Sequence, residues 1–181
     1  MSIQDEVTIE DLYLVKDKAE IVDGELVLKN PTGDLPSSAA LEIVVSLHAF
    51  ARRTKTGRAY TDNAAFIVDL PNRKSFSPDA AFYVGPRALG KFLSGPPLFA
   101  VEVRSEDDYV LKAETKIARK RSDYFAAGTQ VVWDVDVLRD RVIRSYLAVN
   151  PNTAKVFRCG EIADAGPVLP GWSMPVDDLF E

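Results

Sequence analysis

The chain has 181 residues, of which 46% are hydrophobic and 27% charged, and its formal net charge is -5. This composition excludes wholesale disorder, and the length suits one domain over residues 1–181 better than two separate cores. The negative charge argues against a protein that coats nucleic acid regardless of sequence, because such a protein needs a basic surface.

Residues that commonly bind metals or form disulfides are few. One cysteine, Cys159, excludes an internal disulfide framework and fits a reducing compartment. One histidine, His48, disfavours a zinc site of the usual kind. No apolar run reaches membrane-spanning length and the N-terminus lacks a signal-peptide pattern, so we expect a cytoplasmic protein without a membrane partner.

The N-terminal region predicts a short helix followed by a hairpin. Thr8, with acids shortly after it, is a typical helix N-cap for a helix through about Val15. Asp23-Gly24 separates two apolar runs, residues 19–22 and 25–28, and this dipeptide suits a tight two-residue hairpin turn.

A long helix is predicted next, after a loop over residues 30–36. Ser37 or Ser38 can cap it, and it extends to about Lys55 with Gly57 as its stop signal. Glu42 lies in its first turn. The apolar residues recur at helical spacing and predict the buried face, with the histidine as a core or boundary residue. The stripe is Leu41, Val44, Val45, His48 and Ala51, and it is broadened by Ile43, Leu47 and Phe50.

The remaining pattern alternates strands with helical segments, which predicts an α/β (α+β) fold. The C-terminal strands alternate in the manner of antiparallel pairs. The predicted elements are a strand pair 59–61 and 65–70 joined at Asp62-Asn63, a turn at Arg73-Lys74, a strand over 77–84, a helical stretch 87–93, a strand 98–103, a helix 110–127 ending at Gly128, a strand 130–136, strands 141–149 and 155–158 paired across 150–152, and a helical turn 175–180.

Two carboxylates and a lysine concentrate the candidate chemistry. Glu102 lies in an apolar strand, where an unpaired carboxylate is costly and needs a cation or hydrogen-bond donors. Asp79 follows Pro78, a residue suited to the first position of a strand. Lys120 lies in the following helix, in a row with Lys112, Lys116 and Tyr124 at four-residue spacing. Such a set predicts a site for a hard divalent cation and a phosphate.

The order of these parts resembles the PD-(D/E)XK nuclease superfamily and, more closely, the Uma-two family of restriction-endonuclease-like proteins. Nearly the whole chain takes part in the resemblance. The stretches that carry it are Glu20-Ile21-Val22-Asp23-Gly24-Glu25-Leu26-Val27, Ser77-Pro78-Asp79-Ala80-Ala81, Val101-Glu102-Val103-Arg104-Ser105, Lys120 to Gly128, and Trp133-Asp134-Val135-Asp136.

The resemblance implies a mixed central sheet flanked by helices and a DNA nuclease site. It implies Mg²⁺ or Mn²⁺ bound by Asp79, Glu102 and the backbone carbonyl of Val103, with Lys120 as the catalytic lysine. It also raises the expectation of a homodimer that cuts both strands. The superfamily tripeptide has lysine where this chain has Arg104, which cannot act as a base but can bind phosphate. Lys116 is the alternative lysine, and Glu20, Glu42, Arg104 and Tyr124 are further candidates.

Two readings of the function stay open. The first is a metal-dependent endonuclease acting on DNA. The second is a non-catalytic module that binds nucleic acid or protein and keeps the nuclease fold. A small-molecule-binding domain is disfavoured because the sequence has neither a G-x-G-x-x-G motif nor a P-loop.

Overall fold

The structure is a computed structural model that describes residues 6–181. The prediction of one domain over 1–181 therefore includes five residues outside the described part. The α-helices are α1 (Ile9–Leu14), α2 (Asp34–Thr54) and α3 (Ala113–Ala127), and short 3-10 helices cover Glu106–Tyr109, Gly166–Val168 and Val176–Phe180. Within residues 6–181, no helix combines the length and apolar character needed to span a membrane.

Thirteen strands form three sheets in the described chain. The six-stranded sheet has the order β11 (Asn150–Arg158), β10 (Val142–Leu147), β9 (Val131–Asp136), β8 (Phe99–Val103), β6 (Ala80–Tyr83) and β3 (Arg58–Thr61). The five-stranded sheet has the order β2 (Glu25–Leu28), β1 (Ala19–Val22), β5 (Arg73–Phe76), β4 (Phe66–Leu70) and β7 (Leu93–Ser94). A small sheet pairs β12 (Ile162–Asp164) with β13 (Ser173–Pro175). In the larger sheet β8 and β9 are parallel and the other pairs are antiparallel.

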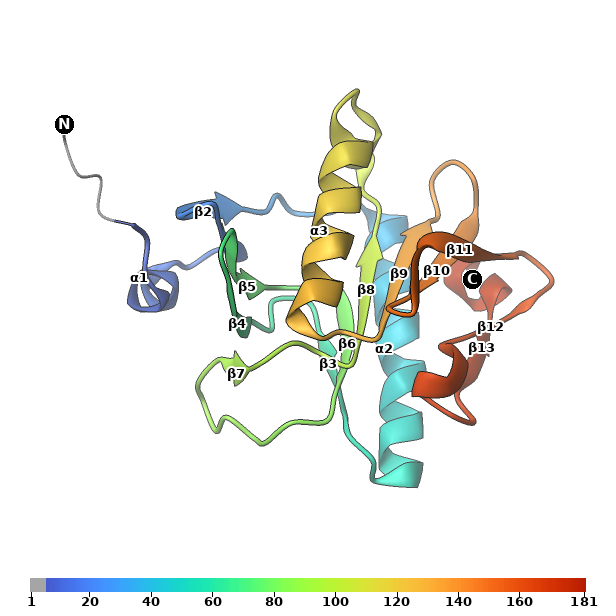
Figure 1. The fold of residues 1–181 in the computed structure, drawn as a ribbon. Coiled ribbons are helices and arrows are strands. Elements are labelled where there is room, and N and C mark those ends of the chain that lie inside the picture. The colour runs from blue at the N-terminus through green and yellow to red at the C-terminus, as the bar shows by residue number, and fades with distance from the viewer. Residues whose placement is uncertain (1–5) are drawn as a thin grey trace.

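The two long helices cover opposite faces of the six-stranded sheet (Figure 1). Alternate residues of each strand point to opposite faces, so neighbouring positions enter different cores. Phe99 and Val101 of β8 pack in the cluster that contains the inner face of α2, whereas Ala100 packs with Tyr124 of α3. By the same alternation Glu102 lies on the α3 face.

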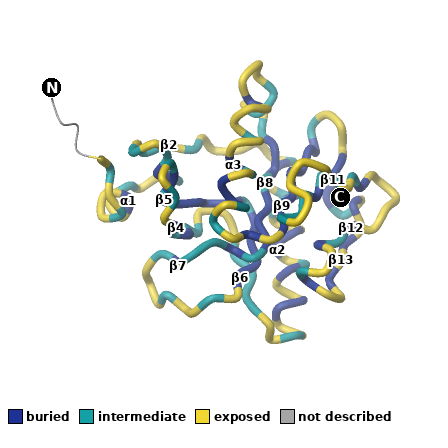
Figure 2. Tube along the Cα trace, viewed as in Figure 1, coloured by how far each residue is buried: buried dark blue, intermediate teal, exposed yellow. Residues whose placement is uncertain are grey.

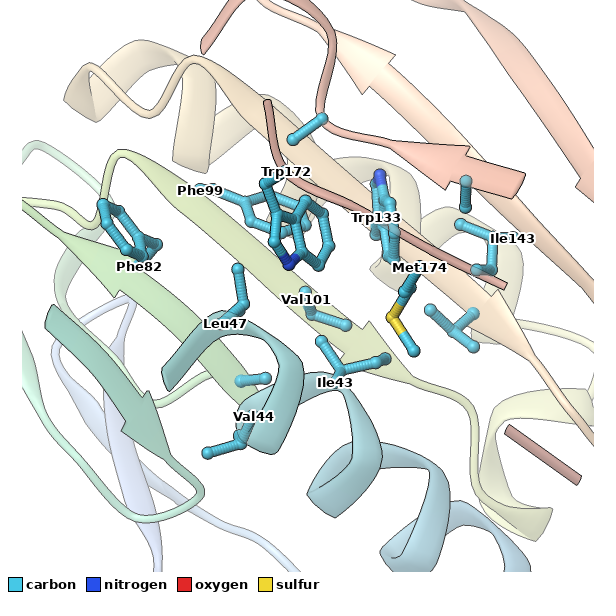
Figure 3. Close-up of a cluster of buried hydrophobic side chains, with 14 of the residues drawn as sticks. Ile43, Val44, Leu47, Phe82, Phe99, Val101, Trp133, Ile143, Trp172 and Met174 are labelled. Carbon is cyan, nitrogen blue, oxygen red and sulfur yellow. The ribbon is translucent and has the colours of Figure 1, made fainter. Parts of the chain in front are cut away.

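The larger core lies between α2 and the sheet (Figure 3). Leu47 is fully buried beneath strand residues that include Phe99 and Trp133, and Trp172 and Met174 from the C-terminal segment close the cluster. Each fully buried large apolar side chain of this kind contributes about 1.5–3 kcal/mol. Figure 2 shows the central strands buried and the outer surface of α3 exposed.

The predicted N-terminal elements are confirmed. Thr8 caps α1, and a capping box joins it to Asp11. Asp23 and Gly24 form the hairpin turn with φ of 52° and 77°, so both residues have the positive φ that this turn requires.

The long helix was predicted correctly at its C-terminal end, but its start is wrong and its buried face is only partly correct. It begins at Asp34 rather than after Ser37. Its end near Lys55 is confirmed, although Lys55 rather than Gly57 is the left-handed residue that caps it. A Cβ at Gly57 would clash with the ring of Phe82, so this glycine permits close packing. Leu41, Val45 and His48 of the predicted stripe are exposed. The other predicted residues are buried, together with Ala39, and the buried face is Ala39, Ile43, Val44, Leu47, Phe50 and Ala51.

The predicted strand pair at Asp62-Asn63 is wrong, although both strands exist. β3 pairs with β6 in the larger sheet, while β4 pairs with β5 and β7 in the other sheet. The predicted turn at Arg73-Lys74 is also wrong. The chain turns at Pro71-Asn72, and Arg73 begins β5 as a buried residue.

Three further boundaries differ from the prediction. Residues 87–93 form no helix, and Leu93 instead begins the short strand β7. The helix predicted from residue 110 is preceded by a separate 3-10 turn and starts at Ala113, and its end at Gly128 is confirmed. The C-terminal hairpin turns at 148–149, so the predicted turn 150–152 belongs to β11.

Candidate active site

One cleft of about 490 Å³ gathers nearly all of the predicted site residues. Its walls come from the β1–β2 hairpin and from α3, and its floor comes from the ends of β6 and β8. Of the nine site candidates singled out from the sequence, all except Glu42 line this cleft. They are Glu20, Asp79, Glu102, Val103, Arg104, Lys116, Lys120 and Tyr124.

The pairing of β6 with β8 explains why the two carboxylates meet. The strands are antiparallel, and their register ends with Ala80 opposite Val101. Just beyond it the N–H of Asp79 donates to the carbonyl of Val101 at 3.0 Å, which holds Asp79 beside the end of β8. Asp79 and Glu102 both line the cleft, and the charge of Asp79 acts to raise the pKa of Glu102.

Asp79 is held by one backbone donor and one lysine. The N–H of Val103 donates to its Oδ2 at 2.7 Å, and Lys18 Nζ lies 2.8 Å from its Oδ1. Lys18 also forms an ion pair with Asp62. Because these contacts fix both oxygens, Asp79 has a defined orientation toward the cleft.

Glu102 is held from α3. Lys120 Nζ lies 2.7 Å from its Oε1, and the Tyr124 hydroxyl donates to the same oxygen at 2.6 Å. Lys120 Nζ is also 2.8 Å from Oε1 of Glu20, so it bridges two carboxylates. Lys120 and Tyr124 reach the cleft together because residues four apart share one helix face, and both are buried.

Burial and charge act in opposite directions on these groups. Burial raises the pKa of Glu102, and the charges of Asp79 and Glu20 add to this effect against that of Lys120. For Lys120, burial lowers the pKa, but Glu102 and Glu20 outweigh it and leave the pKa above its ordinary value. Lys120 is therefore an ammonium cation at neutral pH and is unsuited to act as a general base.

The buried residue Arg73 holds Glu20 in place. Arg73 donates to Glu20 Oε2 at 2.7 Å and to Asp123 Oδ2 at 2.8 Å, and Asn72 donates to Asp123 Oδ1 at 2.9 Å. The N–H of Ser77 donates to Glu20 Oε1 at 2.9 Å. Glu20, which is only 1% exposed, thus has partners for both of its oxygens.

The structure separates the remaining candidates. Arg104 donates two hydrogen bonds of 2.7 Å to Asp134 and also pairs with Glu114, so its guanidinium is already occupied. Lys116 lines the cleft but is exposed, and it is Lys120 that lies within ion-pair distance of Glu102. Glu42 is exposed on α2 and does not line the cleft.

The donor set fits a hard cation such as Mg²⁺. Within residues 6–181, no group of three or more His, Cys, Asp or Glu side chains is arranged to hold a metal ion. Two neighbouring carboxylates and a carbonyl oxygen nevertheless suit Mg²⁺, which usually takes one or two protein carboxylates and retains several waters. Asp79 and Glu102 provide such a pair at an accessible cleft.

Sequence reasoning missed three charged residues around the site, namely Lys18, Arg73 and Asp123. Pro71-Asn72 was the available signal for Arg73, because a turn at these residues makes Arg73 the first residue of a strand. Lys18 lies one residue before β1, but nothing in its local pattern distinguishes it from a surface lysine. Asp123 lies beside Tyr124 on the buried side of α3.

The chain is similar to one protein family and to a solved structure. The model of the family Uma2, described as "Putative restriction endonuclease", matches residues 9–177. Among solved structures, the chain is similar to a "putative nuclease belonging to DUF820" from Anabaena variabilis ATCC 29413. That similarity has a TM-score of 0.75 and 17% identity, and it covers 96% of this chain and 97% of the other. No curated protein gives a match.

The structural similarity confirms the predicted mixed α+β fold. At 17% identity it bears on the fold alone. The family match extends over most of the sequence, including Asp79, the strand that carries Glu102 and the helix that carries Lys120. The chain therefore belongs to the Uma2 family of restriction-endonuclease-like proteins.

Proposed function

We propose that the chain is a divalent-metal-dependent endonuclease that hydrolyses DNA phosphodiester bonds through Asp79, Glu102 and Lys120. One observation carries the proposal: the two carboxylates, from the ends of two paired strands, line one cleft, with the lysine 2.7 Å from Glu102. Family membership supports a nuclease as the reaction class.

Asp79, Glu102 and the Val103 carbonyl are the proposed ligands of Mg²⁺ or Mn²⁺. When bound, such an ion lowers the pKa of a coordinated water and polarises the phosphate. The chain's own contribution is to hold two carboxylates in one cleft. The Val103 N–H orients Asp79, and the Tyr124 hydroxyl orients Glu102.

Lys120 acts in this proposal as a fixed positive charge. Its pKa is raised by Glu102 and Glu20 despite burial, so it remains protonated while the phosphate gains negative charge. A preorganised donor at such a position stabilises the transition state more than it stabilises the substrate. Glu20, held by Arg73, keeps the lysine in place.

A non-catalytic module that binds nucleic acid or protein is the alternative. A specific observation favours it: each carboxylate of the site already has a lysine partner, Lys18 for Asp79 and Lys120 for Glu102. A site that is neutralised internally has less need for a metal ion. Metal binding and turnover therefore discriminate between the two functions.

The test is a titration of Mg²⁺ and Mn²⁺ with supercoiled plasmid and single-stranded DNA as substrates. We expect metal-dependent cleavage by wild type and a loss of roughly a hundredfold or more in Glu102→Gln and Lys120→Ala. Lys116→Ala, which removes the same charge one helical turn away, should lose much less. Equal activity of wild type, Glu102→Gln and Lys120→Ala would remove the catalytic claim.

A homodimer and a cytoplasmic location extend the proposal. Two copies of the site are needed if one encounter is to cut both strands. Sedimentation velocity at assay concentrations checks the first point, and fractionation of cells checks the second. If the protein is a monomer that nicks one strand at a time, the homodimer is refuted but the nuclease activity is not.

A further inference from the structure

Lys18 places its ammonium group on a carboxylate that the proposed function assigns to a metal ion. Its Nζ lies 2.8 Å from Asp79 Oδ1, and its side chain is 16% exposed. Its backbone is fixed because the Lys18 carbonyl accepts the N–H of Lys29 from the opposite side of the hairpin. The lysine is therefore held over the cleft by the fold.

A second carboxylate stands beside this lysine and outside the proposed site. Asp62, in the turn after β3, forms an ion pair with the same Nζ, and its side chain is 56% exposed. Lys18 thus has two acceptors, one that faces the metal position and one that faces solvent. If Asp79 is taken by another cation, Lys18 can keep the Asp62 contact without becoming an unpaired charge.

We propose that Lys18 is an internal counterion that competes with the divalent metal for Asp79 and moves fully onto Asp62 when the metal binds. The inference rests on the proposed function for the identity of the site, and it adds a residue that sets metal affinity. Lys18 is a positioning residue in this account, since it acts through Asp79.

The positions of the charges support this assignment. Burial lowers the pKa of Lys18, but the charges of Asp79 and Glu102 both raise it. The ammonium group therefore interacts electrostatically with both proposed metal ligands. Lys120 differs from Lys18 because its second partner, Glu20, is 1% exposed and is itself locked by Arg73. Of the two site lysines, Lys18 is the one with a solvent-facing alternative partner.

The experiment measures Mn²⁺ binding without DNA, by electron paramagnetic resonance of free Mn²⁺. Lys18→Met should bind Mn²⁺ about tenfold more tightly than wild type, because a competing cation is removed while the methylene stem is kept. Lys29→Met is the matched control, since Lys29 lines the same cleft but does not contact Asp79. Equal affinities of the two variants, or weaker binding by Lys18→Met, would overturn the inference.

A double-mutant cycle tests the transfer to Asp62. Asp62→Asn should weaken Mn²⁺ binding in wild type, because Lys18 then has only Asp79 as its partner, and this effect should largely vanish in the Lys18→Met background. An equal effect in both backgrounds would mean that Asp62 acts only as a distant charge, which contradicts the transfer.

A crystal of wild-type protein soaked in Mn²⁺ gives an answer even if a variant fails to fold. The expected structure has an anomalous peak at Asp79 and Lys18 Nζ paired with Asp62 alone. A peak at Asp79 with Lys18 still in contact, or no Mn²⁺ bound by wild type or Lys18→Met, refutes the inference. Plasmid cleavage is scored separately. If Lys18→Met binds Mn²⁺ more tightly but no variant cuts DNA, the nuclease proposal fails alone.

Discussion

Replacing Arg73 with methionine should destabilise the protein more than any exposed ion-pair mutation. Arg73 is 5% exposed and connects Glu20, on the hairpin, with Asp123, on α3. Methionine fills much of the volume of the arginine stem but leaves two carboxylates without their shared cation. Removing one partner from a buried ion pair costs about 3–5 kcal/mol.

The lower end of that range applies here because the carboxylates keep other partners. Glu20 retains Lys120 and the Ser77 N–H, and Asp123 retains Asn72. With a urea m-value of ~2 kcal/mol/M, a loss of about 3 kcal/mol lowers the unfolding midpoint by about 1.5 M. Equilibrium urea unfolding followed by far-UV circular dichroism measures this shift directly.

Arg119→Met is the matched control for this measurement. Arg119 also donates two hydrogen bonds to a carboxylate, Asp23, but the two side chains are 49% and 53% exposed. Exposed pairs of this kind contribute little because water screens them. The reasoning is refuted if the Arg73 variant unfolds at the same urea concentration as the Arg119 variant.

Three further predictions follow from the site and the core. Tyr124→Phe keeps the ring packing but removes the hydroxyl that donates to Glu102. It should lower the free energy of unfolding, measured in urea, by about 1.5–3 kcal/mol. An unchanged free energy of unfolding would mean that the hydrogen bond contributes nothing. Leu47→Ala in the core should lower the free energy of unfolding by about 2–5 kcal/mol, while Leu41→Ala on the exposed face of the same helix should change it little. Similar losses in the two variants would contradict the assigned buried face. The pKa of Glu20 would be raised by burial alone, but the charges of neighbouring cations lower it from 4.5 to about 2, so its ionised form adds stability above pH 4.5 that is lost as the pH falls toward 2. The difference in free energy of unfolding between wild type and Glu20→Gln should therefore become smaller as the pH is lowered from 4.5 to 2. A constant or growing difference would contradict the lowered pKa of Glu20.

The sequence was most informative where a local rule determines the structure. The Asp23-Gly24 turn and the helix end at Gly128 depend on backbone conformations that few residues adopt, and both were correctly predicted. The strand that carries Glu102 was also correct, because its apolar run needs no knowledge of its partners.

Non-local pairing explains most of the errors in the fold. β3 and β4 are adjacent in the sequence and resemble a hairpin, yet each pairs with a strand in a different sheet. The buried side of α2 was predicted too broadly for a related reason. Leu41 and Val45 are apolar and correctly spaced for burial, but the position of the sheet decides which side of the helix is covered.

The site was only partly predictable from the sequence. Two acids in strand contexts were visible, since a carboxylate in an apolar run requires an explanation. Lys18 and Arg73 were not, because a charged residue beside a turn has the same local pattern whether it is exposed or enters a buried network. Only the register of β1 with β5 brings Arg73 to Glu20.

The central claim is that Asp79 and Glu102 form one metal-dependent cutting site, and Asp79→Asn tests it most directly. Asparagine keeps an oxygen to accept the Val103 N–H but lacks the charge that holds a cation. Asp69→Asn, on the exposed side of β4, is the control. In Mn²⁺-dependent nicking of supercoiled plasmid, we predict that the Asp69 variant cuts at the wild-type rate and the Asp79 variant is inactive. Nicking at the wild-type rate by Asp79→Asn would contradict the claim.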